Sequence, residues 1–199
     1  MKKDFVYLAS ASPRRSELLR QIGVRFTVRA AAIPEEQLPR ETPEAYVTRL
    51  ATAKAESVWA VTVGDLRPVL GADTAVVLDG QVLGKPETEA EAAAMLERLS
   101  GRTHRVLTAV ALRHAGGLET ASSETEVRFR ATTAAERLAY CRTGEPFDKA
   151  GGYGIQGHAA VFVEEIKGSY SGVVGLPLFE TAGLLTRCGV DFWLAARAA

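Results

Sequence analysis

The sequence predicts an α/β protein, and three observations support that class. Apolar runs typical of buried strands alternate with amphipathic stretches typical of helices from one end of the chain to the other. Helix-start signals precede several of the amphipathic stretches. The 199 residues are 47% hydrophobic and 24% charged, which is ordinary for a globular protein with one well-filled core or two small lobes sharing one.

The first half of the chain predicts a strand, a helix, a strand, a helix and a hairpin, in that order. Ser12-Pro13 suits a helix N-cap and first turn, and Thr42-Pro43 gives the same signal for the second helix. Asp79-Gly80 is a two-residue hairpin turn after the apolar run Val69–Leu78. The predicted strands are 5–9, 24–30, 69–78 and 81–83, and the predicted helices are 14–22 and 43–61.

The second half predicts three further helices and three further strands. Thr88 with Glu91, and Thr133 with Glu136, have the spacing of a capping box. A polar loop that contains Gly116-Gly117 is expected to join two of the strands. The predicted strands are 105–112, 124–130 and 161–166, and the predicted helices are 88–100, 133–142 and 177–187.

Charge and cysteine content exclude several classes of protein. Lys plus Arg and Asp plus Glu both total 24, so a basic nucleic-acid-binding surface is not expected and an anionic ligand must be held by a local cluster. No run approaches the ~18 apolar residues of a membrane helix, and Asp4 precedes an N-terminal stretch too polar for a signal peptide. Cys141 and Cys188 are too few for a disulfide framework. We expect a cytoplasmic protein without membrane or nucleic-acid partners.

Two segments suit an anionic ligand. Ser10, Ser12 and Arg14 lie where a strand meets the start of a helix, and free N–H groups, hydroxyls and a guanidinium there can bind phosphate. The alternative is that Ser12 only caps the helix and the arginine is solvated. Residues 144–175 hold eight of the 18 glycines, which favours either a loop pressed against a ligand or a set of tight turns. Within that segment, Gln156 could recognise the edge of a nucleobase.

Charged residues in apolar surroundings form a second group of candidates. Asp73 lies inside an apolar strand, where a carboxylate is costly unless it is paired or binds a metal. Lys54 lies on the apolar face of a predicted helix, and Lys85 follows the hairpin. Glu35-Glu36 could include a metal ligand. The alternatives are an Asp at a strand bulge, a lysine whose ammonium extends to solvent, and two solvated glutamates.

The candidates favour metal-assisted phosphoryl chemistry. No Ser-His-Asp constellation is present, and the three histidines lack the spacing of metal ligands. What the chain offers is a set of carboxylates, lysines, an arginine and a glycine-rich loop. Such a set positions groups and neutralises charge instead of supplying a protein nucleophile.

The motifs together resemble the Maf family of nucleoside triphosphate pyrophosphatases. The matching segments run in family order over almost the whole chain: LASASPRRSELL (8–19), EE (35–36), ATAKA (51–55), GADTAVVLDGQVLGKP (71–86), MLERLSGRTHRV (95–106), EPFDKAGGYGIQG (145–157) and VVGLPL (173–178). The resemblance implies one domain over residues 1–199, with a long mixed sheet, two inseparable lobes and a central cleft like that of inosine-triphosphate pyrophosphatases. It also implies a homodimer.

The resemblance assigns roles by motif position. Asp73 matches the proton acceptor, and Lys54 and Lys85 match other polar catalytic positions. The substrate-binding positions are Ser10, Ser12, Arg14, Thr74 and Gln156, of which the last three are tied to base specificity. A divalent cation, Mg²⁺ or Mn²⁺, is expected on Glu36 and Asp73, although Pro34 makes the position of Glu36 less secure.

The glycine-loop sequence GYGIQG resembles the branch of the family that acts on dTTP and UTP. The expected reaction is hydrolysis to the monophosphate and pyrophosphate. Two alternatives stay open at this point. One is a pyrophosphatase directed at 7-methyl-GTP, and the other is a non-catalytic nucleotide-binding regulator of septum formation.

Overall fold

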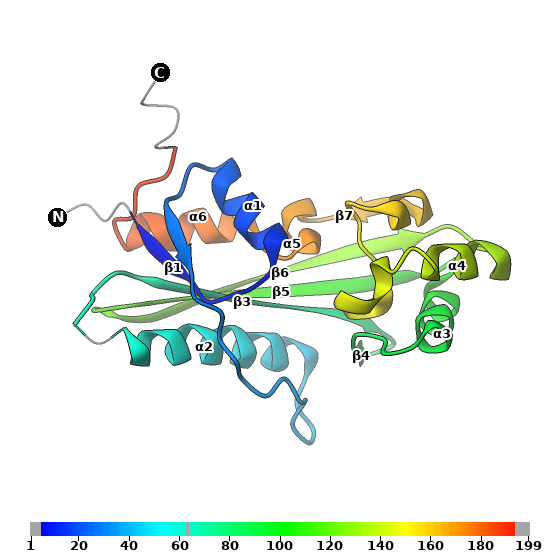
Figure 1. Ribbon diagram of the computed structural model, residues 1–199, viewed down its shortest axis with the longest axis horizontal. Coiled ribbons are helices and arrows are strands. Elements are labelled where there is room, and N and C mark those ends of the chain that lie inside the picture. Colours follow the sequence, from blue (N-terminus) through cyan, green and yellow to red (C-terminus); the bar gives the residue numbers. More distant parts are fainter. Residues whose placement is uncertain (1–4, 63, 194–199) are drawn as a thin grey trace.

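A seven-stranded mixed sheet forms the centre of the protein, which confirms the predicted α/β class (Figure 1). The computed structural model describes residues 5–62 and 64–193, so both ends of the predicted 1–199 domain and residue 63 lie outside the described residues. The strands are β1 (Val6–Leu8), β2 (Phe26–Val28), β3 (Val69–Leu78), β4 (Gln81–Leu83), β5 (Thr103–His114), β6 (Gly117–Phe129) and β7 (Val163–Lys167).

The strand order is β2-β1-β3-β5-β6-β7, and β4 pairs with β3 off this path. β1 runs parallel to β2 and to β3, whereas the pairs β3–β4, β3–β5, β5–β6 and β6–β7 are antiparallel. On the side of β3 that faces β1, the pairing with β1 stops at Leu70 and the pairing with β4 begins at Val76. The five residues between them, 71–75, therefore have an open edge on that side.

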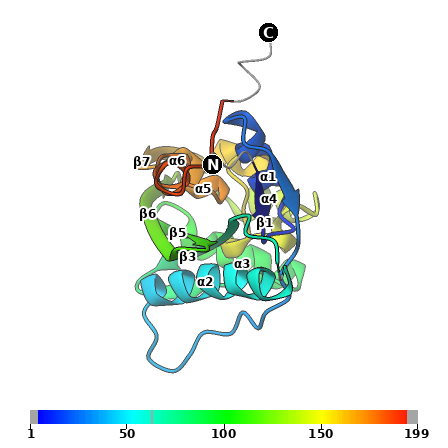
Figure 2. The ribbon, with the colours of Figure 1, turned by 90° about the vertical axis from the view of Figure 1, so that its left-hand side faces the viewer.

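Six α-helices surround the sheet in the part of the chain that the structure describes. They are α1 (Pro13–Gln21), α2 (Pro43–Val61), α3 (Glu89–Leu99), α4 (Ala134–Cys141), α5 (Tyr170–Val174) and α6 (Leu178–Arg187), and short 3-10 turns occupy Glu145–Asp148, Ala150–Gly152 and His158–Phe162. Figure 2 shows α2 on one face of the sheet and α1, α5 and α6 on the other. No helix among the described residues has the length and apolar character needed to cross a membrane.

The predicted helix starts are confirmed, but the capping box predicted for Thr88 with Glu91 is only half formed, because the Glu91 carboxylate accepts from the Glu87 amide. Thr42 accepts a hydrogen bond from the Ala45 amide, and Thr133 with Glu136 forms a reciprocal capping box. At α1, however, the Ser12 side chain caps no amide of the helix. Instead the Ser12 backbone amide donates to Ser10 Oγ at 3.2 Å, so the Ser10 side chain fixes the turn that precedes α1.

The polar loop predicted around Gly116-Gly117 is shortened to a turn at residues 115 and 116. β6 begins at Gly117, seven residues earlier than predicted, and β5 extends two residues further than predicted, to His114. Every second residue of this part of β6 is exposed, so its polar side chains belong to a solvated face of the sheet and not to a loop. The short helix α5 was not predicted either.

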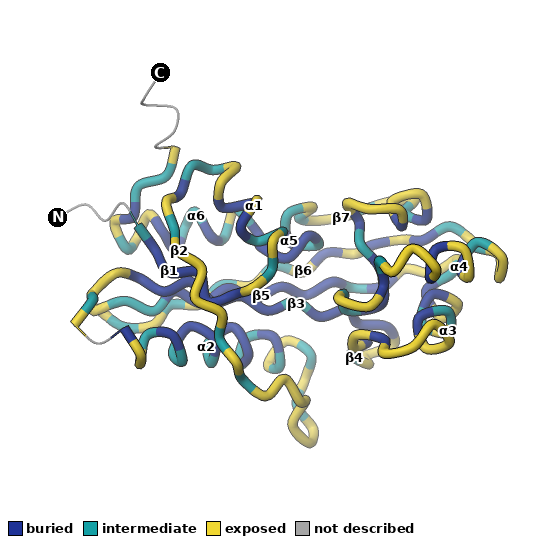
Figure 3. The backbone as a smooth tube through the Cα atoms, viewed as in Figure 1, coloured by how far each residue is buried: buried dark blue, intermediate teal, exposed yellow. Residues whose placement is uncertain are grey.

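Two apolar clusters lie on the two faces of the sheet, and β3 contributes to both. Leu70, Ala72 and Val76 belong to the cluster that includes α1 and α6, whereas Val69, Ala75 and Val77 belong to the cluster under α2. Figure 3 shows β3 and β5 as largely buried along the centre of the molecule. This alternation directs the Asp73 side chain toward α2 and the neighbouring Thr74 side chain toward α1 and α5.

Candidate active site

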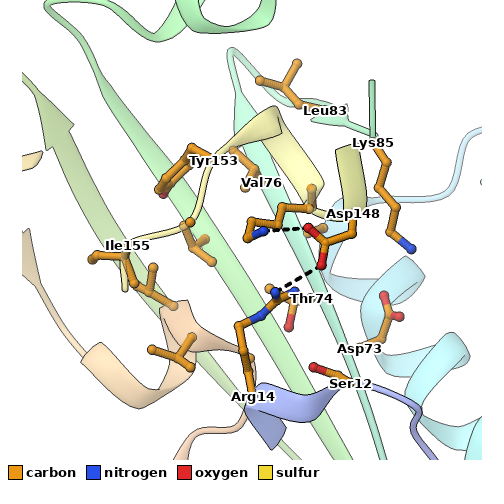
Figure 4. Close-up of a pocket in the computed structure, with 18 of the residues that line it drawn as sticks. Ser12, Arg14, Asp73, Thr74, Val76, Leu83, Lys85, Asp148, Tyr153 and Ile155 are labelled. Atoms are coloured by element: carbon orange, nitrogen blue, oxygen red, sulfur yellow. Dashed lines mark hydrogen bonds and ion pairs between the residues drawn. The ribbon is translucent and has the colours of Figure 1, made fainter. Parts of the chain in front are cut away.

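A pocket lies at the open edge of β3, and most of the predicted site residues line it (Figure 4). Its walls come from the start of α1, from α2, β3 and β4, and from the glycine-rich segment 148–157. Seven of the predicted residues line the pocket: Ser12, Arg14, Lys54, Asp73, Thr74, Lys85 and Gln156. Ser10 and Glu36 do not line it. Since residues 71–75 lack a partner strand on this side, the pocket reaches side chains from both faces of β3.

One wall of the pocket is built from alternating lysines and carboxylates. Lys54 Nζ lies 2.6 Å from Asp73 Oδ1 and 2.6 Å from Glu35 Oε1. Lys85 Nζ lies 3.5 Å from Glu35 Oε2. We call these four residues the lysine–carboxylate wall. The lysine and the aspartate are buried, and Glu35 and Lys85 are partly exposed at its outer end.

The close approach of α2 to β3 brings Lys54 to Asp73. A Cβ atom at Gly71 would overlap the backbone of Ala51 and Ala55, so only glycine lets the helix lie this near to the strand. Lys54 lies between those two alanines in the sequence, and its ammonium reaches Asp73 two residues beyond the glycine. The lysine is thus an interior ion-pair partner, and the prediction that it could extend to solvent does not hold.

The surroundings shift the pKa values of the two carboxylates of this wall in opposite directions. Burial raises the pKa of Asp73 above its usual range, and the charge and hydrogen bond of Lys54 offset only part of that effect. Burial also acts to raise the pKa of Glu35, but the hydrogen bond and charge of Lys54, with Lys85, outweigh it and lower that pKa. Asp73 is consequently the better proton acceptor of the two.

The structure brings Glu35, not Glu36, to the pocket. Glu36 is exposed, and its carbonyl oxygen accepts a hydrogen bond from Arg49 Nη2 at 2.9 Å. The carbonyl of Glu35 accepts from Tyr46 Oη at 2.8 Å, so α2 holds this segment at two adjacent residues. Glu35 lines the pocket and Glu36 does not.

Arg15 organises the opposite face of β3, and sequence reasoning gave it no role. Its Nη1 donates to Ser10 Oγ at 3.0 Å, its Nη2 to Thr74 Oγ1 at 3.3 Å and its Nε to the Gly175 carbonyl at 2.8 Å. Burial lowers the pKa of this guanidinium, and the charge of Asp73 acts in the other direction. Ser10 therefore supports Arg15 instead of lining the pocket. The only sequence signal was its place beside Arg14.

The second wall of the pocket is residues 144–157, which we call the glycine loop. Asp148 Oδ2 lies 3.1 Å from Arg14 Nη1 and so links the loop to α1. Lys149 Nζ donates to the other Asp148 oxygen and to the Glu145 carbonyl. Figure 4 shows this chain of charges crossing the pocket from Arg14 to Asp148. The motif EPFDKAGGYGIQG contains Asp148 and Lys149, but the sequence alone predicts no function for them.

Gln156 lies at the pocket end of the glycine loop. It is exposed, and its amide has no hydrogen-bond partner among residues 5–62 and 64–193. Tyr153 and Ile155 are buried beside it and give this part of the pocket an apolar wall. The amide is thus available to a ligand that combines a flat apolar ring with donors and acceptors at its edge.

The carboxylates that could hold a metal are few. Among the described residues there is no cluster of three or more His, Cys, Asp or Glu side chains suited to a metal ion. Three carboxylates line the pocket. Asp148 is paired with Arg14 and Lys149, whereas Asp73 and Glu35 lie on either side of one ammonium. Mg²⁺ commonly binds through one or two carboxylates together with substrate phosphates, and this donor set fits that mode.

Chemically, the pocket suits a polyanion next to a proton acceptor. Five cationic side chains reach it, and they are Arg14, Arg15, Lys54, Lys85 and Lys149. Their charge is local, since the chain as a whole is neutral. Asp73 stands among them with a raised pKa. In the described part of the chain its side chain pairs with Lys54 and with no serine or cysteine nucleophile.

Comparisons with known proteins agree with the motifs. The family profile described as Maf-like protein matches residues 5–188. A protein of Methylobacillus flagellatus named dTTP/UTP pyrophosphatase is 54% identical over 185 residues, covering 93% of each chain. A protein of the same name from Aromatoleum aromaticum is 53% identical over 92% of this chain and 95% of its own.

A solved structure also matches, over a smaller part of the chain. It is a nucleoside-triphosphatase, a dITP/XTP pyrophosphatase, from Mycobacterium abscessus. The match has a TM-score of 0.40 and 18% identity, and it covers 63% of this chain and 74% of the other.

Proposed function

The chain belongs to the Maf family, and from that premise we propose that it hydrolyses dTTP and UTP to the monophosphate and pyrophosphate. The observation that carries the proposal is the buried Asp73 carboxylate, paired with Lys54 in a pocket with further cations. A triphosphate supplies the negative charge that such a pocket can neutralise. The names of the relatives supply the two nucleotides.

Asp73 acts as the general base in the proposed reaction. It takes a proton from a water molecule as the water oxygen forms a bond to the α-phosphorus. The bond between that phosphorus and the bridging oxygen of the pyrophosphate breaks, and pyrophosphate leaves with the electron pair. Lys54 holds the Asp73 carboxylate in place through the 2.6 Å contact. Lys54, Lys85 and the guanidinium of Arg14 offset the charge of the leaving group.

We propose that a divalent cation, Mg²⁺ or Mn²⁺, is held by Asp73 and Glu35 together with the triphosphate. When bound, the ion supplies positive charge that polarises the phosphate oxygens. Glu35 takes the place that the sequence predicted for Glu36, because its carboxylate reaches Lys54 and Lys85 whereas Glu36 does not line the pocket.

The glycine loop recognises the base in this proposal. Gln156 presents both a donor and an acceptor, which match the alternating acceptors and donor on the edge of uracil or thymine. Thr74 and Arg14 line the same pocket as that loop and the lysine–carboxylate wall. The names of the relatives do not favour the 7-methyl-GTP alternative or the non-catalytic regulator.

Three further predictions stay part of the proposal. They are a homodimer, a cytoplasmic location, and one inseparable catalytic domain over residues 1–199. Sedimentation of the purified protein tests the first, and limited proteolysis followed by activity assays tests the last.

A substrate panel tests the function directly. Purified protein is offered dTTP, UTP, CTP and 7-methyl-GTP, each with Mg²⁺, with Mn²⁺ and with excess chelator. We expect metal-dependent release of pyrophosphate, fastest from dTTP and UTP. Preference for 7-methyl-GTP, or binding of nucleotide without any release of pyrophosphate, would replace the proposal with one of its alternatives.

A further inference from the structure

We propose that His104 is a positioning residue that fixes the glycine loop through Tyr153 and thereby sets the nucleobase preference of the pocket. The inference rests on the proposed function for the role of Gln156 in recognising the base. The segment that contains His104, MLERLSGRTHRV (95–106), is a motif that the mechanism above does not use. The structure gives this histidine one specific contact with the pocket.

That contact is a buried hydrogen bond between two elements of the fold. His104 lies near the start of β5, and its Nε2 is 2.8 Å from Tyr153 Oη. The histidine is 2% exposed and the tyrosine 5%. Phe129 packs edge to face against both rings, at centroid distances of 5.0 Å and 4.8 Å. The tyrosine is therefore fixed in position as well as in orientation.

Tyr153 couples this bond to the base-reading end of the loop. Two residues, Gly154 and Ile155, separate it from Gln156, and it lines the pocket with Ile155. A second contact fixes the preceding residues, since the Gly151 amide donates to the Gly84 carbonyl at 2.9 Å. The position of the free Gln156 amide thus depends on the point at which the tyrosine ring is held.

Glu145 fixes the far end of the same loop. Its Oε2 accepts from the His158 amide at 2.8 Å, and its Oε1 accepts from Tyr140 Oη at 3.0 Å. Gly154 and Gly157 lie so close to this region that side chains there would meet Glu145. Between these contacts and Gly151, the Gly154 amide donates to Tyr140 Oη on α4 at 3.3 Å. Within the described residues, the hydrogen bond from this stretch to the central sheet is that of Tyr153.

His104 makes no second side-chain hydrogen bond, in the described part of the chain, that could replace its bond to Tyr153. The other ring nitrogen of His104, Nδ1, is buried without a hydrogen-bond partner in the described part of the chain. Burial lowers the pKa of His104 to about 4, so the ring is neutral near pH 7. Removing the tyrosine hydroxyl would leave Nε2 unpaired as well, and a buried polar atom without a partner favours movement of the loop.

The test uses variants that remove the bond from either side. Tyr153→Phe keeps the ring and deletes only the hydroxyl, and His104→Leu deletes the other partner. His104→Gln places an amide nitrogen near the former Nε2 and serves as the conservative rescue. His114→Leu is the matched control, because this histidine is on the same strand but outside the pocket.

Steady-state kinetics on UTP and CTP give the first readout, since these nucleotides differ only at the base edge. We expect Tyr153→Phe and His104→Leu to lower the UTP preference in kcat/KM about tenfold, the loss of roughly 1.4 kcal/mol. The change should appear in KM for UTP more than in kcat. His104→Gln should recover most of the preference, and His114→Leu should keep all of it. Combining Tyr153→Phe with Gln156→Ala should cost no more selectivity than Gln156→Ala alone.

Hydrogen exchange and equilibrium binding give readouts that need no catalysis. We expect the amides of residues 154–157 to exchange faster in Tyr153→Phe than in the parent protein, and UTP to bind more weakly relative to CTP. If the parent protein binds nucleotides but hydrolyses none, the proposed function fails while these two readouts still decide the inference. Unchanged selectivity and unchanged loop exchange, with only a lower unfolding temperature, would overturn it and leave His104 a core residue.

Discussion

The two walls of the pocket are built on different physical principles. The lysine–carboxylate wall places charges on a long helix and a central strand, with Lys54 and Asp73 buried against each other at 2.6 Å. The glycine loop has little regular structure and is fixed by single hydrogen bonds, such as Tyr153 to His104 and Gly151 to Gly84. A rigid charged wall suits the reacting phosphates, and a loop fixed at a few points suits discrimination between bases.

Because the two walls differ in this way, substitutions in them should change different properties of the protein. Changing a charge in the lysine–carboxylate wall should alter the rate of reaction, because that wall contacts the groups that carry proton and charge. Changing a contact of the glycine loop should alter stability and selectivity, because its contacts determine where Gln156 lies.

Replacing Asp73 should remove the catalytic function of the lysine–carboxylate wall. Asp73→Asn keeps the shape of the side chain but removes the proton acceptor, so we expect kcat to fall about 10²–10⁴-fold. The measurement is pyrophosphate release from UTP, with the unfolding temperature recorded alongside. Asp79→Asn, at the exposed turn after the same strand, is the control and should keep activity within about twofold. Near-normal turnover in Asp73→Asn would remove Asp73 from the role of base.

Lowering the pH should destabilise the folded protein through His104, the residue that holds the glycine loop. The pKa of His104 is about 4 in the folded protein against 6.5 for the free side chain, so below pH 6.5 the unfolded state binds a proton that the folded state does not. The contribution of neutral His104 to the free energy of unfolding is therefore fully present above pH 6.5 and is lost as the pH falls toward 4. The loss amounts to roughly 3 kcal/mol.

Urea unfolding at pH 7 and at pH 4.5, on the parent and on His104→Gln, measures this effect. The other titrating groups are common to both proteins, so the difference between their pH dependences isolates His104. Identical pH dependences would mean that His104 does not remain neutral in the folded state.

A methyl group at Gly151 should disturb the loop without touching the charged wall. Gly151 has φ +70°, and a Cβ there would lie 2.9 Å from the Val76 side chain. Gly151→Ala should therefore cost about 2 kcal/mol of stability from backbone strain and crowding together. Gly144→Ala has a similar φ of +76° with nothing within 4 Å, and it should cost only about 1 kcal/mol. Equal losses in the two variants would argue against close packing of the loop on β3.

The two adjacent glutamates should behave differently. Glu35→Gln removes a carboxylate that contacts Lys54 and Lys85, and we expect about a tenfold lower kcat/KM with a raised requirement for metal. Glu36→Gln changes an exposed side chain and should stay within about twofold of the parent. Metal titrations of both variants make the comparison. A larger effect at Glu36 would restore the assignment that the sequence alone suggested.

The lysine–carboxylate wall could be predicted because its residues conflict with their surroundings. A carboxylate within the apolar run Val69–Leu78, and a lysine on an apolar helix face, each need a partner, and the partners proved to be one another. The choice between Glu35 and Glu36 could not be made in this way. Neighbouring residues of the same type carry no sequence signal for which of them faces inward.

The glycine loop could be predicted only as a loop. Its glycine content indicated close approaches, but the approach of Gly151 to Val76 and the bond from Tyr153 to His104 join residues far apart in the sequence. Arg15 was missed for the same reason, since its partners lie on three separate segments. The polar part of β6 was mistaken for a loop, because a solvated sheet face and a loop have similar composition.

Hydrolysis of UTP in water enriched in ¹⁸O tests the central claim most directly, because it reports which phosphorus the water attacks. If water activated by Asp73 attacks the α-phosphorus, the label appears in the monophosphate and the pyrophosphate stays unlabelled. Label in pyrophosphate, or in inorganic phosphate released from the γ-position, would contradict the account.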